Sequence, residues 1–244
     1  MKKLICASIL APFLVTFAGA EENLELDSMV SDNLVATLYH EFGHGVIALW
    51  DLPIYGREED AADNLSALMI DRLYDSDVSE DVIRSVAMTF AASAETDDAD
   101  FPYWDVHGTN SQRFYNTVCI YYGLDPENRQ AFAGEMDLPE DRADGCEDEA
   151  LLVTNSWGAI LDEMEENGPG DSFSYRGSEK DDPFLASVIQ SEVDALNAMF
   201  SMDFELPVIV EDCGEVNAFF SSDTGGVTMC TEYEPYTRDQ LSHM

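Results

Sequence analysis

Basic residues are scarce in this chain of 244 residues, which has 11 lysines and arginines against 50 aspartates and glutamates and a formal net charge of −39. Binding to nucleic acid requires clustered lysine and arginine to contact the phosphates, so nucleic acid is excluded as a partner. The same charge disfavours anionic membrane surfaces and acidic substrates. Apolar residues still make up 45% of the sequence, which is enough for a packed core and excludes a disordered acidic tail.

Long apolar runs are also scarce, and the one at the N-terminus is short. Two lysines precede an apolar stretch over residues 4–17, and small residues follow at 18–20. The stretch is too short to span a bilayer comfortably, and the pattern is typical of a cleaved signal peptide. We therefore predict a signal peptide over 1–20 and a mature single domain over 21–244. The mature protein is expected to be periplasmic or secreted and free of the membrane.

Cysteine is rare, and no two cysteines have the CxxC spacing of a cysteine metal site. One of the five lies in the predicted signal peptide, so the mature chain keeps an even number, as expected for two disulfides in an exported protein. Three pairings are possible, and we favour the pairing of sequence neighbours, which joins Cys119 to Cys146 and Cys213 to Cys230.

The secondary-structure pattern changes along the chain. Helical periodicity dominates over 31–200, with a first helix expected from Ser31 or Asp32 to about Trp50. The Gly- and Ser-rich stretch 167–182 is predicted to be a loop. Strand patterns follow within 206–233, in segments expected at 206–210, 217–220 and 227–233. The predicted fold class is α+β, a mostly helical domain with a small antiparallel sheet built by the C-terminal segment.

The most informative motif is His40-Glu41-Phe42-Gly43-His44. Two histidines four residues apart on a helix project from one face, so both imidazoles can bind one ion. Glu41 lies at the edge of that face, where a carboxylate can hold and deprotonate a water molecule. The motif predicts a zinc site with His40 and His44 as ligands and Glu41 as the catalytic general base.

A hydrolytic zinc site usually has three protein ligands, and no third histidine follows at short range. The acidic segment at the start of the second predicted helix offers a carboxylate instead. Glu59 and Asp63 are four residues apart, which suits a metal ligand and a carboxylate that orients a ligand histidine. Glu58 is the competing ligand, but the residue four positions after it is an alanine. We favour Glu59, although an acidic first helical turn also has a plain explanation in the helix dipole.

The motif and its surroundings resemble known families. HEFGH followed by Glu59 and Asp63 is similar to the gluzincin metallopeptidases, the thermolysin-like group. The stretch HEFGHGVIALWDLPIYGREEDAADNLSALM resembles more closely a bacterial family of metallopeptidases classed as DUF4344, as do DVHGTNSQRFYNTVCIYYG and LPEDRADGCEDE. These matches cover roughly residues 34–160. The resemblance implies a zincin-like fold and hydrolysis of peptide bonds.

The order of segments departs from that family. A segment like LPVIVEDCGEVNAFFSSDTGGVTMCTEYEP precedes the zinc helix there, whereas here it occupies residues 206–235, after the helix. The few mature residues before the first helix cannot form a sheet. The resemblance therefore implies a circularly permuted member, in which the C-terminal strands lie beside the helix that carries His40 and His44. The alternative is an unrelated C-terminal hairpin.

A third histidine, His107, lies in a loop rich in aromatic residues. In gluzincins a histidine and a tyrosine stabilise the oxyanion of the tetrahedral intermediate, and the resemblance implies that catalytic role for His107, with Arg113 or Tyr115 close by. The plain alternative is a surface-loop histidine.

Together these features predict an exported zinc-dependent metallopeptidase that acts on peptides or proteins with Zn²⁺ as its cofactor. Two alternatives remain open. One is a catalytically silent, zinc-stabilised binding or scaffold protein of the cell envelope, because a metal site alone does not prove turnover. The other is a hydrolase of a non-peptide amide. The sequence predicts neither the cleavage specificity nor the oligomeric state.

Overall fold

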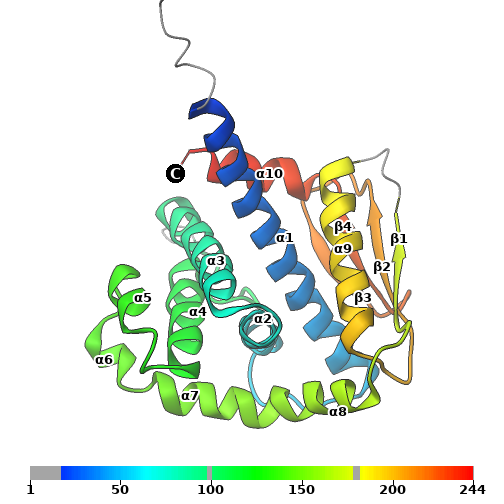
Figure 1. The fold of residues 1–244 in the computed structure, drawn as a ribbon, viewed down its shortest axis with the longest axis horizontal. Coiled ribbons are helices and arrows are strands. Elements are labelled where there is room, and N and C mark those ends of the chain that lie inside the picture. Colours follow the sequence, from blue (N-terminus) through cyan, green and yellow to red (C-terminus); the bar gives the residue numbers. More distant parts are fainter. Residues whose placement is uncertain (1–17, 98–100, 178–181, 244) are drawn as a thin grey trace, which may run out of the picture.

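A computed structural model describes residues 18–97, 101–177 and 182–243. Most of the predicted signal peptide, residues 1–17, lies outside this part of the chain. Helices make up most of the fold (Figure 1). They are α1 (Ala18–Leu49), α2 (Glu58–Leu73), α3 (Ser76–Asp97), α4 (Asn110–Leu124), α5 (Gln130–Glu135), α6 (Glu140–Ala143), α7 (Cys146–Val153), the π-helical turn η2 (Thr154–Gly158), α8 (Ala159–Asn167), α9 (Pro183–Met199) and α10 (Tyr233–Leu241).

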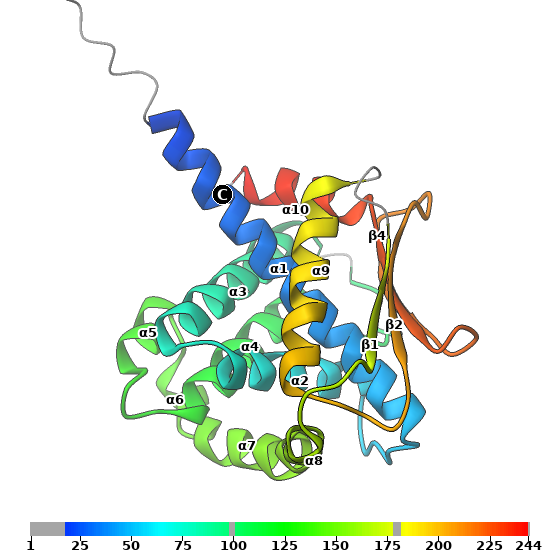
Figure 2. The same cartoon turned by 45° about the vertical axis from the view of Figure 1, so that its right-hand side comes forward.

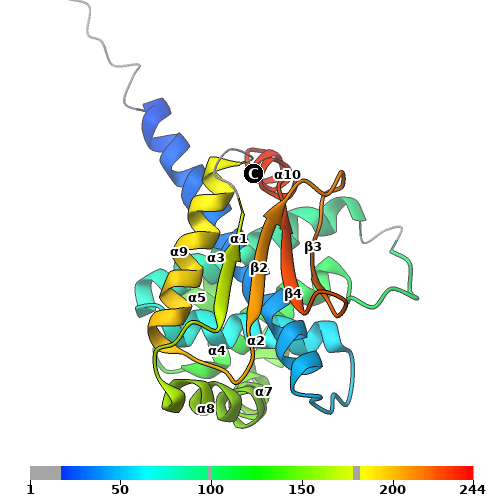
Figure 3. The same cartoon turned by 90° about the vertical axis from the view of Figure 1, so that its right-hand side faces the viewer.

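The strands form one mixed sheet in the order β1-β2-β4-β3. They are β1 (Phe173–Arg176), β2 (Leu206–Glu211), β3 (Ala218–Ser221) and β4 (Gly226–Cys230). β2 pairs in parallel with both β1 and β4, while β3 pairs antiparallel to β4. Figure 3 shows this sheet face-on, with β3 at one edge.

Helix α1 runs through the centre of the molecule, with α2, α3 and α4 on one side and the sheet on the other (Figures 1 and 2). Two glycines of the HEFGHG segment permit these close approaches. A Cβ added at Gly43 would lie 3.1 Å from the Cα of Ala62 on α2, and one at Gly45 would lie 2.9 Å from a methyl group of Leu206 on β2. The histidine motif is thus held between α2 and the sheet.

Two further contacts fix α2 against its neighbours. The hydroxyl of Ser66 donates a hydrogen bond of 2.8 Å to the carbonyl oxygen of Ala36 on α1. The indole N–H of Trp157, in the π-helical turn, donates one of 2.9 Å to the carbonyl oxygen of Ala61. The first bond ties α2 to α1 and the second ties it to the π-helical turn, so together they fix the position of α2 and with it that of Glu59.

Several expectations about element boundaries were wrong. The first helix does not begin at Ser31 or Asp32, because α1 already includes Ala18. The stretch 167–182 contains strand β1, which pairs with β2. The sheet is therefore mixed rather than antiparallel, and one of its strands comes from outside 206–233. The strand expected over 227–233 ends at Cys230, and Tyr233 begins helix α10.

The overall α+β class is confirmed, and so are both favoured disulfides. Cys119 on α4 is bonded to Cys146 at the start of α7, and Cys213 is bonded to Cys230 at the end of β4. The second bond joins the connection after β2 to the neighbouring strand and so fixes the approach to β3. None of the helices in the described ranges has the length and hydrophobicity required to cross a bilayer.

Candidate metal centre

Three side chains from two helices converge on one point. They are His40 and His44 on α1 and Glu59 in the first turn of α2. The Nε2 atoms of the two histidines lie 3.2 Å apart, and each lies 3.2 Å from Oε2 of Glu59. The three ligand-type atoms therefore form a triangle with equal sides.

This triangle has the dimensions of one face of a zinc tetrahedron. Nitrogen and oxygen ligands at about 2.0–2.1 Å from a tetrahedral zinc ion lie about 3.3–3.4 Å apart. The donor set of two imidazoles and one carboxylate is also typical of zinc sites that keep a coordination position open. The residues present therefore fit a zinc ion.

The proton positions support the same conclusion. Nδ1 of His40 lies 2.8 Å from Oδ1 of Asp63, and Nδ1 of His44 lies 2.8 Å from Oε1 of Glu58. Because an ionised carboxylate only accepts hydrogen bonds, both Nδ1 atoms carry a proton. When both imidazoles are neutral, the Nε2 atom of each ring carries a lone pair. The two lone pairs then face each other and the carboxylate of Glu59. A cation at this point relieves their mutual repulsion.

Asp63 is itself held by Arg113 of α4. The Nε and Nη2 atoms of the guanidinium donate hydrogen bonds of 2.8 and 2.7 Å to the two carboxylate oxygens. Burial alone would raise the pKa of Asp63, but the charge of Arg113 and the bond to His40 hold it well below its usual range. Asp63 therefore stays ionised and orients His40. Burial likewise opposes protonation of His40, yet its hydrogen bonds to Asp63 and Glu59 raise its pKa to about 9. Without a cation, Nε2 of His40 therefore carries a proton at neutral pH, and a metal ion that binds there would displace it.

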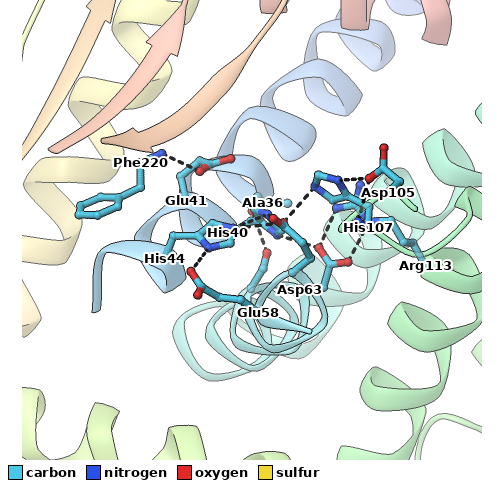
Figure 4. Close-up of polar contacts among 12 residues, drawn as sticks. Ala36, His40, Glu41, His44, Glu58, Asp63, Asp105, His107, Arg113 and Phe220 are labelled. Carbon is cyan, nitrogen blue, oxygen red and sulfur yellow. Dashed lines mark hydrogen bonds and ion pairs between the residues drawn. The ribbon is translucent and has the colours of Figure 1, made fainter. Parts of the chain in front are cut away.

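Glu41 is buried between the motif and the edge strand. Its Oε2 accepts a hydrogen bond of 2.9 Å from the backbone N–H of Phe220 on β3 (Figure 4). Burial raises the pKa of Glu41, while the neighbouring histidine charges and the Phe220 N–H oppose that rise. The strand thus fixes one carboxylate oxygen and leaves the other for a further partner.

His107 reaches the same centre from the loop before α4. Its Nε2 lies 3.0 Å from Oε2 of Glu59, and its Nδ1 lies 3.1 Å from Oδ1 of Asp105. With a carboxylate at each nitrogen, the imidazole is stabilised in its protonated form, and its bond to Glu59 is the main cause of its raised pKa. His107 does not belong to the group of mutually close ligand atoms formed by His40, His44 and Glu59.

A cavity of about 280 Å³ opens beside these residues, between the helices and the edge of the sheet. It is lined by His40, Glu41, Asp63, His107, Arg113 and Tyr233, among others. Its volume is near the lower end of the range found for ligand pockets. The metal centre thus faces a space that can hold part of a small molecule or peptide.

His40, Glu41, His44, Glu59, Asp63 and His107 lie together, whereas Tyr115 lines the cavity at the start of α4 and not the one at the metal centre. Three features of the site were not foreseen. The sequence predicts that Arg113 lies near His107, but it gives no sign of the ion pair between Arg113 and Asp63. The partly buried Tyr233, whose hydroxyl lies 3.0 Å from Oγ1 of Thr37, begins a helix and does not lie at the end of a strand. The N–H of Phe220 was given no role. Each depends on contacts between segments 50 or more residues apart, so no local pattern in the sequence reports them.

Comparison with known proteins agrees with this geometry. No curated protein and no solved structure matches the chain. The profile of family DUF4344, described as "Putative metallopeptidase", matches residues 2–161 and 181–243. These ranges include every residue of the centre. The circular permutation, in which the strand segment 206–235 follows the helix of His40 and His44 instead of preceding it, stays a prediction. The chain belongs to the DUF4344 family.

Proposed function

We propose that this protein is an exported, zinc-dependent peptidase in which His40, His44 and Glu59 bind the metal. The observation that carries the proposal is the triangle of ligand atoms with sides of 3.2 Å, next to a buried carboxylate and an open cavity. When bound, zinc supplies Lewis-acid chemistry, because it polarises a carbonyl oxygen and acidifies water.

Glu41 is proposed as the general base. Oε2 is fixed by the N–H of Phe220, and no hydrogen bond from a described residue reaches Oε1. That oxygen is free to accept a proton from water as it attacks a peptide carbonyl. The pKa of the carboxyl group is raised by burial, which makes it a better proton acceptor. The same group then returns the proton to the departing amine.

His107 is proposed to stabilise negative charge that develops on the carbonyl oxygen. The two carboxylates beside it favour the imidazolium form, in which Nδ1–H donates to Asp105 and Nε2–H lies at the centre beside Glu59. A positioned cationic donor at the edge of the centre is the type of group that stabilises an oxyanion. Because it contacts Glu59, His107 also restrains the proposed metal ligand.

The proposed location is periplasmic or secreted. The signal-peptide pattern at the N-terminus supports export, and two disulfides are expected in a protein that folds in an oxidising compartment. The proposed substrates are peptides or unfolded proteins, since the family is one of peptidases.

The test is incubation of the purified exported protein with unfolded casein, with and without a zinc chelator, alongside a measurement of its metal content. We expect about one zinc ion per chain, cleavage that the chelator stops, and recovery when zinc is added back. Zinc bound without any hydrolysis would instead identify a catalytically silent scaffold. Hydrolysis unaffected by the chelator would exclude the metal mechanism.

A further inference from the structure

Arg57 differs from the other arginines because it forms no ion pair with a carboxylate of a described residue. All eight arginines of the sequence lie in the described ranges, and seven of them form ion pairs with carboxylates there. Arg57 has no such ion pair with a described residue, although the chain contains 50 acidic residues. In so acidic a protein, a guanidinium without a carboxylate partner is unexpected, because nearby carboxylates are abundant.

This unpaired arginine lies beside the metal centre. It is the residue just before α2 and is separated from Glu59 only by Glu58. Its Nη1 lies against the backbone of the 107–109 loop, since a Cβ added at Gly108 would be only 3.3 Å away. Its guanidinium therefore sits next to the residue that follows His107.

The guanidinium also lines a cavity of about 430 Å³ at the start of α4. Arg113 and Arg142 line the same cavity, so three of the eight arginines meet there. Arg113 is shared with the cavity at the metal centre, which makes the two spaces neighbours. Asp60 is the one acidic residue in this lining, and the charge of Arg57 opposes the rise that burial causes in its pKa, although no close ion pair joins the two side chains.

Arg113 and Arg142 are already bound to carboxylates of this chain. Arg113 binds Asp63 through two hydrogen bonds, and Arg142 binds Glu149 through two of 2.7 Å. The charges of Arg113 and Arg142 are therefore largely neutralised. Their guanidinium groups still make this cavity less negative than the rest of the acidic surface. Arg57 acts on Asp60 only at a distance, and no carboxylate among the described residues occupies its planar set of donors. Such a set matches the two oxygens of a carboxylate.

We propose that Arg57 binds a carboxylate of the peptide substrate, in the first place the C-terminal one, and so directs cleavage to bonds near the C-terminus. This inference rests on the proposed peptidase function. The net charge of −39 repels acidic side chains in general, whereas every unblocked peptide carries a terminal carboxylate. A single arginine in the cavity next to the metal centre can therefore recognise a chain end without selecting acidic sequences.

The test uses the zinc-loaded Glu41→Gln protein, so that binding is measured without turnover. The probes are hexapeptides with the same neutral side chains that end either in a free carboxylate or in a carboxamide. A third, amidated hexapeptide carries one internal glutamate. We expect the free acid to bind about fivefold more tightly than the amide, the size typical of a partly exposed charge pair. The preference should weaken as salt is added.

Adding Arg57→Gln to this background should abolish the preference, and Arg57→Lys should keep part of it, because the charge remains without the planar donors. The matched control is Arg176→Gln. It removes the same charge from the exposed Arg176 on β1, at the opposite edge of the sheet from β3, and should leave the preference unchanged.

Equal affinity for acid and amide, or a preference that survives Arg57→Gln, would overturn the proposal, as would failure to bind either peptide. Tighter binding of the internal glutamate than of the free acid would overturn its assignment to the chain end. These outcomes do not depend on hydrolysis. Casein cleavage without an acid preference would therefore refute the role of Arg57 alone, and an Arg57-dependent preference without cleavage would refute only the peptidase function.

Discussion

Oδ1 of Asp63 lies 2.8 Å from Nδ1 of His40, and this contact turns the opposite nitrogen of the ring toward the candidate metal position. The relationship joins residues 23 positions apart, on α1 and α2. Arg113 holds the same carboxylate from α4, so three helices determine the orientation of one ligand.

Asp63→Asn should lower zinc affinity by about ten- to a hundredfold, the range observed when a partner that orients a metal ligand is changed. An asparagine can still accept the proton of His40, but it lacks the charge that keeps Arg113 and the imidazole in place. Competition with a chelator of known affinity measures the change. Asp60→Asn, which removes the same charge from the same helix, is the control. Equal losses in the two variants would show that general charge, not the contact with His40, matters.

Glu59→Ala should reduce zinc affinity far more than Asp63→Asn, because it removes a ligand atom. Glu58→Ala should have at most the effect of a lost orienting partner, since Glu58 contacts only the outer nitrogen of His44 and its side chain is half exposed. Metal content after dialysis against a weak chelator distinguishes the two. If Glu58→Ala alone releases the metal, the assignment of the third ligand is wrong.

The sequence alone predicts the residues of the centre that are close together on one helix, but not the contacts that distant segments make with them. The spacings within HEFGH and between Glu59 and Asp63 are helical periodicities, and each can be recognised from neighbouring residues. The pairing of Arg113 with Asp63 and of Phe220 with Glu41 spans 50 and 179 positions, respectively. Such contacts are set by the packing of α4 and β3, which no local pattern reports.

The errors in the fold have similar causes. Asp32 resembles a helix N-cap, yet it lies inside α1, and Ser85 of α3 donates a hydrogen bond of 2.8 Å to its carboxylate. Strand β1 has only four residues in a Gly- and Ser-rich stretch, and its pairing with β2 defines it. The aromatic residues around Tyr233 favour a strand, but Pro235 in the first turn is compatible with the start of helix α10.

Asp32 also predicts a pH dependence of stability. Burial and the nearby charge of Asp81 raise its pKa to about 6, although the hydrogen bond from Ser85 opposes the rise. The folded protein thus holds a proton that the unfolded chain releases near pH 4, and this contribution to stability is lost as the pH rises from about 4 to 6.

Asp32→Asn should therefore leave the free energy of unfolding nearly unchanged at pH 4 and raise it by about 1–2 kcal/mol at pH 7. This is less than the full value of the shift, because Asp32 is only partly buried. Urea unfolding of the two proteins across this pH range gives the difference. A stabilisation that is the same at every pH would contradict the raised pKa.

The central claim is that Glu41 performs the hydrolysis while His40, His44 and Glu59 hold the zinc. The most direct measurement compares zinc content and casein cleavage in the wild-type protein and in Glu41→Gln. Glutamine has nearly the same shape and can still accept the N–H of Phe220, but it cannot take a proton from water. The account predicts one zinc ion per chain in both proteins and a loss of cleavage of at least about a hundredfold in the variant, as for the removal of a general base. Full cleavage by a zinc-loaded Glu41→Gln protein would contradict it.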